Sequence, residues 1–173
     1  MSILSHRRIH KGFTIVELII SITVIGILAG IVVVSYNGGQ KKAQDTSVRA
    51  DLEAIAGHLE AGRVRNTPAN FASTEAELEA LDIKIAKNAY DTTIAYNMIY
   101  CVLTTPGAEQ YQAFTLVAKS KSGNIFKIDQ DGFKTHTLTQ SDLTASLCST
   151  FSQTLVSNGM TTGGVWKTWA RSG

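Results

Sequence analysis

The chain has 173 residues, of which 44% are hydrophobic and 17% are charged, and its formal net charge at pH 7 is +2. These values indicate one small globular domain with an additional apolar segment, and they exclude a disordered or low-complexity chain. Three positive charges, on Arg7, Arg8 and Lys11, precede the apolar segment, and the remainder of the chain is nearly neutral. Because nucleic-acid binding normally requires clustered basic side chains, no specific nucleic-acid partner is predicted.

The first element is an apolar run of 22 residues that begins at Phe13, in which Glu17 is the single charged residue. A helix of this length covers the hydrocarbon core of a bilayer, which is about 30 Å thick. We therefore predict a basic leader at residues 1–12 that stays in the cytoplasm, a membrane-spanning helix at residues 13–36, and an exported domain at residues 37–173. A secretory signal peptide is the alternative, but its apolar core is normally shorter and ends at an A-x-A-like site, which this sequence lacks.

A second helical segment is predicted at residues 40–65, because apolar residues recur three and four positions apart on one face. These residues are Ala43, Val48, Leu52, Ile55, Ala56 and Leu59. Asn66-Thr67-Pro68 should end this helix, and Gly38-Gly39 can bend or loosen its junction with the apolar run. Thr74 and Glu77 have the spacing of a capping box, which predicts a short helix.

Alternating and β-rich segments then predict strands at residues 94–103, 111–118 and 125–128. The turn sequences between and after them are Thr105-Pro106-Gly107, Ser122-Gly123-Asn124 and Asp129-Gln130-Asp131-Gly132. We predict an antiparallel meander of three or four strands. A final helix before Asn158-Gly159 is predicted from Leu143, Leu147, Phe151 and Leu155. The fold class is α+β: a long N-terminal helix packed on the sheet, with a short C-terminal helix or loop region.

The two cysteines, Cys101 and Cys148, are too few and too far apart for the paired spacings of a zinc site or a redox motif. In an exported domain they can form a disulfide, and we predict that pairing. Two buried free thiols are the alternative.

The most specific motif lies where the leader meets the apolar run. It reads Lys11-Gly12-Phe13-Thr14-Ile15-Val16-Glu17-Leu18. This segment resembles the prepilin cleavage and methylation signal of type IV pilins and pseudopilins, and the resemblance extends through Gly26, Ala29 and Tyr36. It implies cleavage between Gly12 and Phe13 by a prepilin peptidase, N-methylation of Phe13, and assembly by a membrane platform and a cytoplasmic ATPase.

The role of Glu17 can be inferred from its chemistry as well. A carboxylate inside a membrane helix is costly and requires a partner or a functional reason. Cleavage after Gly12 turns the amide nitrogen of Phe13 into a cationic amine, so that Glu17 can pair with the amine of a neighbouring subunit and guide docking. The alternative is a glutamate near the interface that reaches the lipid headgroups.

Weaker signals support further interpretations. Gly26 and Gly30 have a G-x-x-x-G spacing that lets membrane helices pack closely, although such spacings also arise by chance. Asp129 and Asp131 carry oxygen ligands suited to calcium, but the full EF-hand pattern is absent and a hairpin turn explains them equally well. No metal or cofactor site is predicted.

The remaining residues do not indicate an enzyme. His6, His10, His58 and His136 show no metal-ligand spacing, and the catalytic motifs of hydrolases and nucleotide-binding enzymes are missing. Trp166 and Trp169 either close the small core or anchor a partner surface.

The sequence therefore predicts a structural subunit that polymerises with identical or related pilins. It would be a single-pass membrane protein, in contact with lipid, before assembly and part of an extracellular or cell-envelope filament afterwards. A pseudopilin of type II secretion or of a DNA-uptake filament would carry the same motifs. A single-pass anchored binding module that never polymerises is the rival from another class, but it would need neither Glu17 nor the Gly12-Phe13 site.

Overall fold

The computed structural model of the chain describes residues 12–65, 69–104, 111–134 and 137–173. The predicted leader up to Lys11, the helix stop at Asn66-Thr67-Pro68, the turn at Thr105-Pro106-Gly107 and three of the four histidines lie outside the described residues. The chain divides into two compact units, one up to Gly39 and one from Gln40 to Gly173.

Helix α1 (Ile15–Arg65) contributes to both units. It is helical at Gly38 and Gly39, so the predicted loosening of the junction is not seen. In the first unit its large apolar side chains are exposed, from Ile15 to Val33. Within the described part of the chain, α1 is the one helix that is long enough and apolar enough to cross a membrane.

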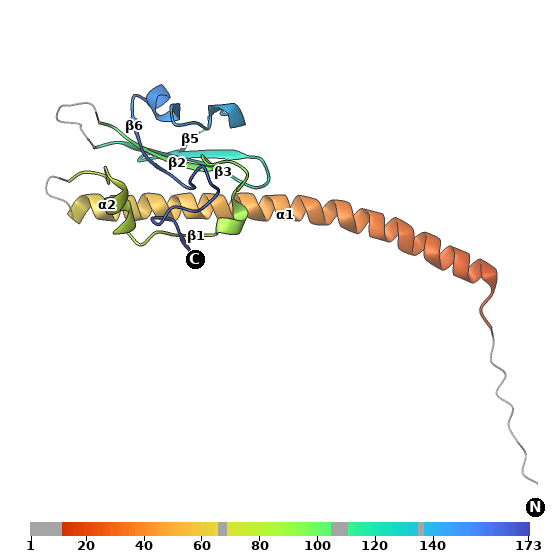
Figure 1. The fold of residues 1–173 in the computed structure, drawn as a ribbon. Helices are drawn as coiled ribbons and strands as arrows, with labels where there is room; N and C mark the ends of the chain where they lie inside the picture. The colour runs from red at the N-terminus through yellow and green to blue at the C-terminus, as the bar shows by residue number, and fades with distance from the viewer. Residues whose placement is uncertain (1–11, 66–68, 105–110, 135–136) are drawn as a thin grey trace, which may run out of the picture. The chain divides into compact units, whose positions relative to one another are not determined.

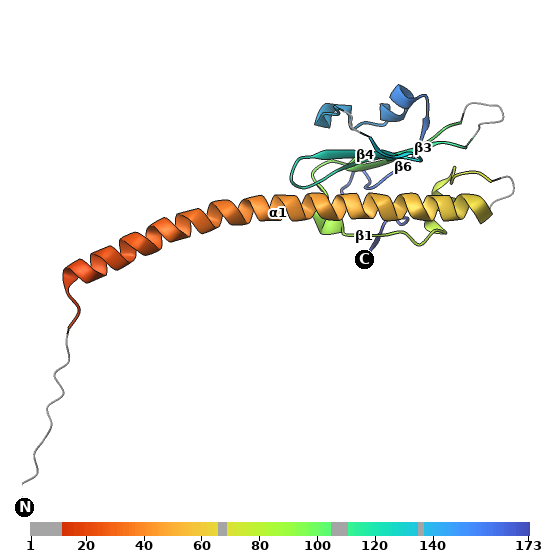
Figure 2. The same cartoon turned by 180° about the vertical axis from the view of Figure 1, so that it is seen from behind.

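In the second unit α1 packs on an antiparallel sheet. Its apolar face contributes Val48, Leu52, Ile55 and Leu59, all fully buried. The strands are β2 (Met98–Val102), β3 (Phe114–Lys119), β4 (Ile125–Asp129), β5 (Gly132–Lys134) and β6 (Thr154–Asn158), in the order β5-β4-β3-β2-β6. Figures 1 and 2 show α1 along one face of this sheet and a C-terminal lobe, residues 137–153, on the other.

The two faces of the sheet belong to separate apolar clusters. Met98, Tyr100 and Val102 point into the main core with α1, whereas Ile99 and Cys101 point into a smaller cluster under the C-terminal lobe. Every residue of β2 is therefore buried. Because both faces of a central strand are covered here, the alternation seen in the sequence does not separate a wet face from a dry one.

Short elements complete the second unit. Helix α2 (Glu75–Glu79) begins at Thr74 with the capping box that the sequence predicts. Strand β1 (Lys84–Ile85) is followed by the 3₁₀ turn η1 (Lys87–Ala89) and pairs in parallel with β7 (Arg171–Ser172).

The main sheet has five strands where three or four were predicted. The additional strand comes from a segment that was expected to be helical. The segment forms the 3₁₀ turns η2 (Gln140–Asp142) and η3 (Leu147–Phe151) and then strand β6. Ser152 adopts a left-handed conformation with φ 55°, which ends the helical turn, and Leu155 then pairs with Cys101 of β2. The final helix predicted from Leu143, Leu147, Phe151 and Leu155 is therefore wrong, whereas the short C-terminal helical or loop region of the predicted fold class is present as the two 3₁₀ turns.

Two hairpin turns agree with the sequence. Gly123 and Gly132 have φ of 104° and 103°, a conformation that glycine adopts without the cost of a Cβ. They join β3 to β4 and β4 to β5 in antiparallel register.

Candidate functional site: the N-terminal motif and its supports

The predicted docking carboxylate lies at the start of α1, where it caps its own helix. Glu17 Oε2 accepts hydrogen bonds from the Thr14 backbone N–H at 2.9 Å and from the Thr14 hydroxyl at 2.8 Å. The Glu17 backbone N–H donates to Thr14 Oγ1 at 3.2 Å. This reciprocal arrangement is a capping box, and it holds the carboxylate at the positive end of the helix dipole.

The capping arrangement leaves part of the carboxylate accessible. Among the described residues, no donor lies on Glu17 Oε1, and Phe13, which precedes the helix, is 86% exposed. Sequence reasoning missed the role of Thr14. The T-x-x-E spacing that identified Thr74 and Glu77 is present at Thr14 and Glu17 too, so the signal was there.

Beyond Glu17 the apolar part of α1 satisfies its own polar groups. The Ser21 hydroxyl donates to the Glu17 carbonyl and the Thr23 hydroxyl to the Ile19 carbonyl, each at 2.7 Å. Such bonds hide hydroxyls that would otherwise be costly in a bilayer. At Gly26 and Gly30 no heavy atom, apart from the chain neighbours and the adjacent helix backbone, lies within 4 Å of the position that a Cβ would take, so both sites are open on the helix surface.

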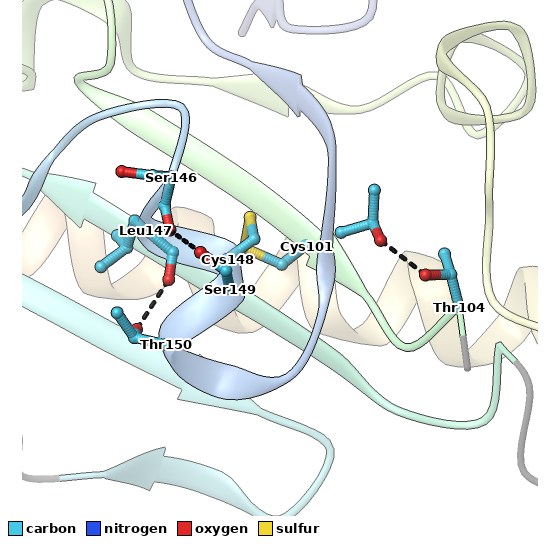
Figure 3. Close-up of a disulfide and its surroundings, with 8 residues drawn as sticks. Cys101, Thr104, Ser146, Leu147, Cys148, Ser149 and Thr150 are labelled. Carbon is cyan, nitrogen blue, oxygen red and sulfur yellow. Dashed lines mark hydrogen bonds between the residues drawn. A yellow bond between two sulfur atoms is a disulfide. The ribbon is translucent and has the colours of Figure 1, made fainter.

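The predicted disulfide is present in the second unit. Cys101 of β2 and Cys148 of η3 are bonded with a Cα–Cα distance of 5.5 Å, and both residues are buried. Figure 3 shows the bond between the strand and the 3₁₀ turn, where Thr150 Oγ1 donates to the Leu147 carbonyl at 2.6 Å. The disulfide thus fixes the C-terminal lobe to the sheet.

An ion pair between a buried lysine and a partly buried aspartate supports the same lobe. Lys119 Nζ lies 2.6 Å from Asp91 Oδ2 and donates to Gln140 Oε1 at 2.6 Å. Burial raises the pKa of Asp91, but hydrogen bonds from Lys119 and Thr93 outweigh it and leave the pKa below its usual value. The carboxylate therefore stays ionised, and the charge of Lys119 is satisfied at both of its partners.

Asp129 and Asp131 occupy the β4–β5 hairpin. The Asp131 backbone N–H donates to Asp129 Oδ1 at 3.0 Å, and Lys134 Nζ lies 3.9 Å from Asp129 Oδ1 and 3.6 Å from Asp131 Oδ2. Within the described ranges, no group of three or more histidine, cysteine, aspartate or glutamate side chains is placed to hold a metal ion.

The two tryptophans belong to the core. Trp169 is fully buried, and its Nε1 donates to the Asn158 carbonyl at 3.2 Å. Trp166 meets Tyr90 edge to face with ring centroids 5.6 Å apart. Closing the core, rather than anchoring a partner, is the role that these contacts support.

A helix that is apolar and exposed over its first half, capped by a Thr-Glu pair and continued along an antiparallel sheet, defines a pilin-like architecture. The family described as the prokaryotic N-terminal methylation motif matches residues 7–33. The type II secretion system core protein G of Klebsiella michiganensis is 33% identical over 132 residues, which cover 73% of this chain and 87% of that protein. The chain belongs to the type IV pilin and pseudopilin family.

Two further relatives are a second type II secretion protein and a type IV pilus component. The type II secretion system core protein G of Klebsiella pneumoniae is 35% identical over 71 residues, 41% of this chain, and the match spans about half of that protein, 49%. The type IV wide pilus major component PilA4 of Thermus thermophilus is 29% identical over 124 residues, 64% of this chain and 93% of that protein. No solved structure matches the chain.

Proposed function

We propose that this chain is the precursor of a structural subunit of a type IV pilus or pilus-like filament. Residues 1–12 are a leader that a prepilin peptidase removes, residues 13–36 span the membrane before assembly and form the filament core afterwards, and residues 37–173 are the exported domain. The observation that carries the proposal is the Gly12-Phe13 motif at the head of a helix whose apolar side chains are exposed along its first unit. A membrane platform and an assembly ATPase would act on the mature subunit, which is not itself an enzyme.

Docking uses the unoccupied oxygen of Glu17. Cleavage after Gly12 creates the cationic amine of Phe13, and the amine of a neighbouring subunit binds Glu17 Oε1 while Oε2 remains on Thr14. Within the apolar surroundings the two charges form a hydrogen-bonded pair, which is favoured over two separated charges in a medium of low dielectric constant. Gly26 and Gly30 present open helix surface, at which a neighbouring helix can approach closely.

The alternative within the family is a pseudopilin of a type II secretion or DNA-uptake filament. It is favoured by the identity of 33% to the secretion protein of Klebsiella michiganensis, against 29% to the pilus component of Thermus thermophilus. Long surface filaments at native expression would support a pilus. Loss of protein export, or of transformation by added DNA, on deletion of the chain without such filaments would support the pseudopilin.

The experiment that tests the proposal combines electron microscopy of filaments with intact-mass measurement of their subunit. The mass should correspond to a chain that begins at N-methylated Phe13. Gly12→Ala should be processed better than Gly12→Glu, because a bulky charge at the scissile bond obstructs the peptidase. Assembled subunits that retain residues 1–12 would refute the maturation step, and a processed chain that never polymerises would favour the anchored binding module.

Variants of Glu17 test the docking step. Glu17→Ala removes the acceptor for the neighbour's amine and Glu17→Gln removes only its charge, so both should leave a folded protein in the membrane with few or no filaments. Ser21→Ala is the matched control, because it removes a polar group from the next turn that is bonded to its own backbone. Normal polymerisation of either Glu17 variant at equal expression would show that the ion pair is not needed.

A further inference from the structure

Three exposed lysines lie at the end of the second unit where the chain enters it. Lys41 and Lys42 are exposed on the first turn of α1 in this unit, and Lys121 is exposed in the β3–β4 turn. We call residues 40–45 and 120–124 the proximal end. Within the part of the chain that the structure describes, none of the three ammonium groups lies within 4 Å of a carboxylate.

Contacts through Asp45 hold the two parts of the proximal end together. Asp45 Oδ1 accepts from the Ser122 hydroxyl at 2.5 Å and Asp45 Oδ2 from the Asn124 amide at 2.7 Å. The Lys121 backbone N–H donates to the Ala89 carbonyl at 2.8 Å, which fixes the turn from the other side. Because Lys41 and Lys42 lie four and three residues before Asp45, they share its side of the helix, within a turn of the contact to the β3–β4 turn.

The charge at the proximal end remains positive. Partial burial raises the pKa of Asp45, but hydrogen bonds from Ser122, Ser120 and Asn124 lower it overall, so this carboxylate is ionised. Its hydrogen-bond donors are neutral side chains, and it is the one acidic residue within residues 40–45 and 120–124, which hold the three lysines. Elsewhere in the unit, most basic side chains pair with carboxylates within 4 Å. These are Arg63, Lys119, Lys127, Lys134, Lys167 and Arg171.

We propose that the proximal end binds the anionic phospholipid headgroups of the membrane in which the subunit is held before assembly. The inference rests on the proposed membrane span, residues 13–36, because Lys41 follows its last residue by five positions. Connectivity alone therefore keeps these lysines close to the membrane surface, whatever orientation the two units adopt. Lysine is a compact cation suited to phosphate, and basic residues near an anionic leaflet are attracted to it.

The binding has a consequence for assembly. A subunit that leaves the bilayer must exchange its headgroup contacts for those of the filament, so the proximal end adds a lipid-dependent and salt-dependent barrier to extraction. The other possible occupant is an acidic surface of a neighbouring subunit. The two occupants differ in when the lysines matter: in the membrane before assembly, or only in the filament.

The test uses the full chain reconstituted into phosphatidylcholine bilayers that contain spin-labelled phosphatidylglycerol or spin-labelled phosphatidylcholine. Electron paramagnetic resonance measures which lipid is held at the protein. We expect phosphatidylglycerol to be preferred by a factor of about five or more, since each lysine at an anionic surface contributes roughly that factor. The preference should fall in high salt, where the Debye length is only about 3 Å at 1 M.

Charge-matched variants locate the effect. Lys41→Gln/Lys42→Gln should lower the preference severalfold and Lys121→Gln should lower it less. Arg65→Gln/Lys84→Gln removes two exposed charges that have no carboxylate within 4 Å among the described residues, and it should leave the preference intact. An equal loss in the control pair, or an undiminished preference in the proximal variants, would overturn the inference. Normal lipid preference with fewer filaments in the proximal variants would assign the lysines to a neighbouring subunit instead.

The proposed function fails separately from this inference. If the chain does not stay with the bilayer on flotation in either lipid, the membrane span itself is refuted, and the inference falls with it. If the chain floats but holds both lipids equally, only the headgroup contact is refuted.

Discussion

Replacing both cysteines should release the C-terminal lobe while the helix–sheet core stays folded. Among the described residues, the disulfide holds the lobe to the sheet together with the small apolar cluster, the Lys119 contacts and Lys127, whose Nζ lies 4.6 Å from the ring centroid of Phe151. The main core, which holds the buried face of α1, contains neither cysteine. Cys101→Ala/Cys148→Ala is the preferred variant, because both sites are buried and serine would leave a hydroxyl without a partner.

The size of the effect follows from the length of chain that the bond closes. The cysteines are 47 residues apart, and closing a loop of that length stabilises the native state by about 4 kcal/mol on the chain-entropy model. That is a large fraction of the roughly 5–15 kcal/mol by which small domains are stable. The variant should therefore remain folded in buffer and unfold at a much lower urea concentration.

The assay is urea unfolding of the full chain in detergent micelles, paired with amide hydrogen exchange. Exchange should accelerate most at residues 138–151, where the lobe opens locally, and at the buried face of α1 only as far as the lower stability makes global unfolding easier. Reduction of the wild type by a dithiol is the control, because it removes the cross-link and keeps the sulfur atoms. A loss of stability under about 1 kcal/mol, far below the loop-closure value, would refute the reasoning. Exchange that rises as much in β3 and β4 as in the lobe would refute it too.

Three other predictions concern stability, each measured by urea unfolding of the full chain. Burial raises the pKa of Asp51 despite hydrogen bonds from the Ala86 N–H and the Tyr90 hydroxyl. The folded state therefore binds this proton more tightly than the unfolded state, and stability falls as pH rises through the raised pKa. Asp51→Asn should flatten the dependence of stability on pH above pH 3.8, and an unchanged slope would contradict this. Trp169→Ala should lower the free energy of unfolding by about 3–5 kcal/mol, because it leaves a cavity in the main core. A loss typical of a surface residue would instead support the alternative that this side chain anchors a partner surface. Ser152→Gly should stabilise the protein by up to about 1 kcal/mol, because glycine adopts the left-handed backbone without strain. Ser149→Gly in η3 is the comparison, and it should not stabilise the protein, because Ser149 is not among the residues with positive φ.

Elements set by local rules could be predicted from the sequence. The buried face of α1 follows the three-and-four spacing of Val48, Leu52, Ile55 and Leu59. Helix α2 follows its capping box, and the hairpin turns follow Gly123 and Gly132. In each case the deciding interaction joins residues a few positions apart, so the pattern alone carries the information.

The C-terminal third was harder because its structure depends on distant partners. Leu147 and Leu155 have helical spacing, yet Leu147 lies in the 3₁₀ turn η3 and Leu155 lies in strand β6, which pairs with β2. Both side chains pack in the small cluster beside the disulfide. Strands β1 and β7 have two residues each and are defined by pairing across 87 positions, such as Lys84 with Arg171. No local pattern predicts a contact of that kind, since tertiary packing overrides propensity.

The geometry at the start of α1 bears on how one carboxylate can serve both the free subunit and the filament. A glutamate that only awaited a neighbour would leave the Thr14 backbone N–H, just before α1, without the acceptor that it has here. Instead Glu17 already bonds Thr14 through one oxygen, and the other oxygen remains for the neighbour's amine. On the proposed function, docking then adds an interaction without breaking the cap. It follows that Thr14→Val should impair assembly less than Glu17→Ala, because it loosens the carboxylate without removing the charge that the amine needs.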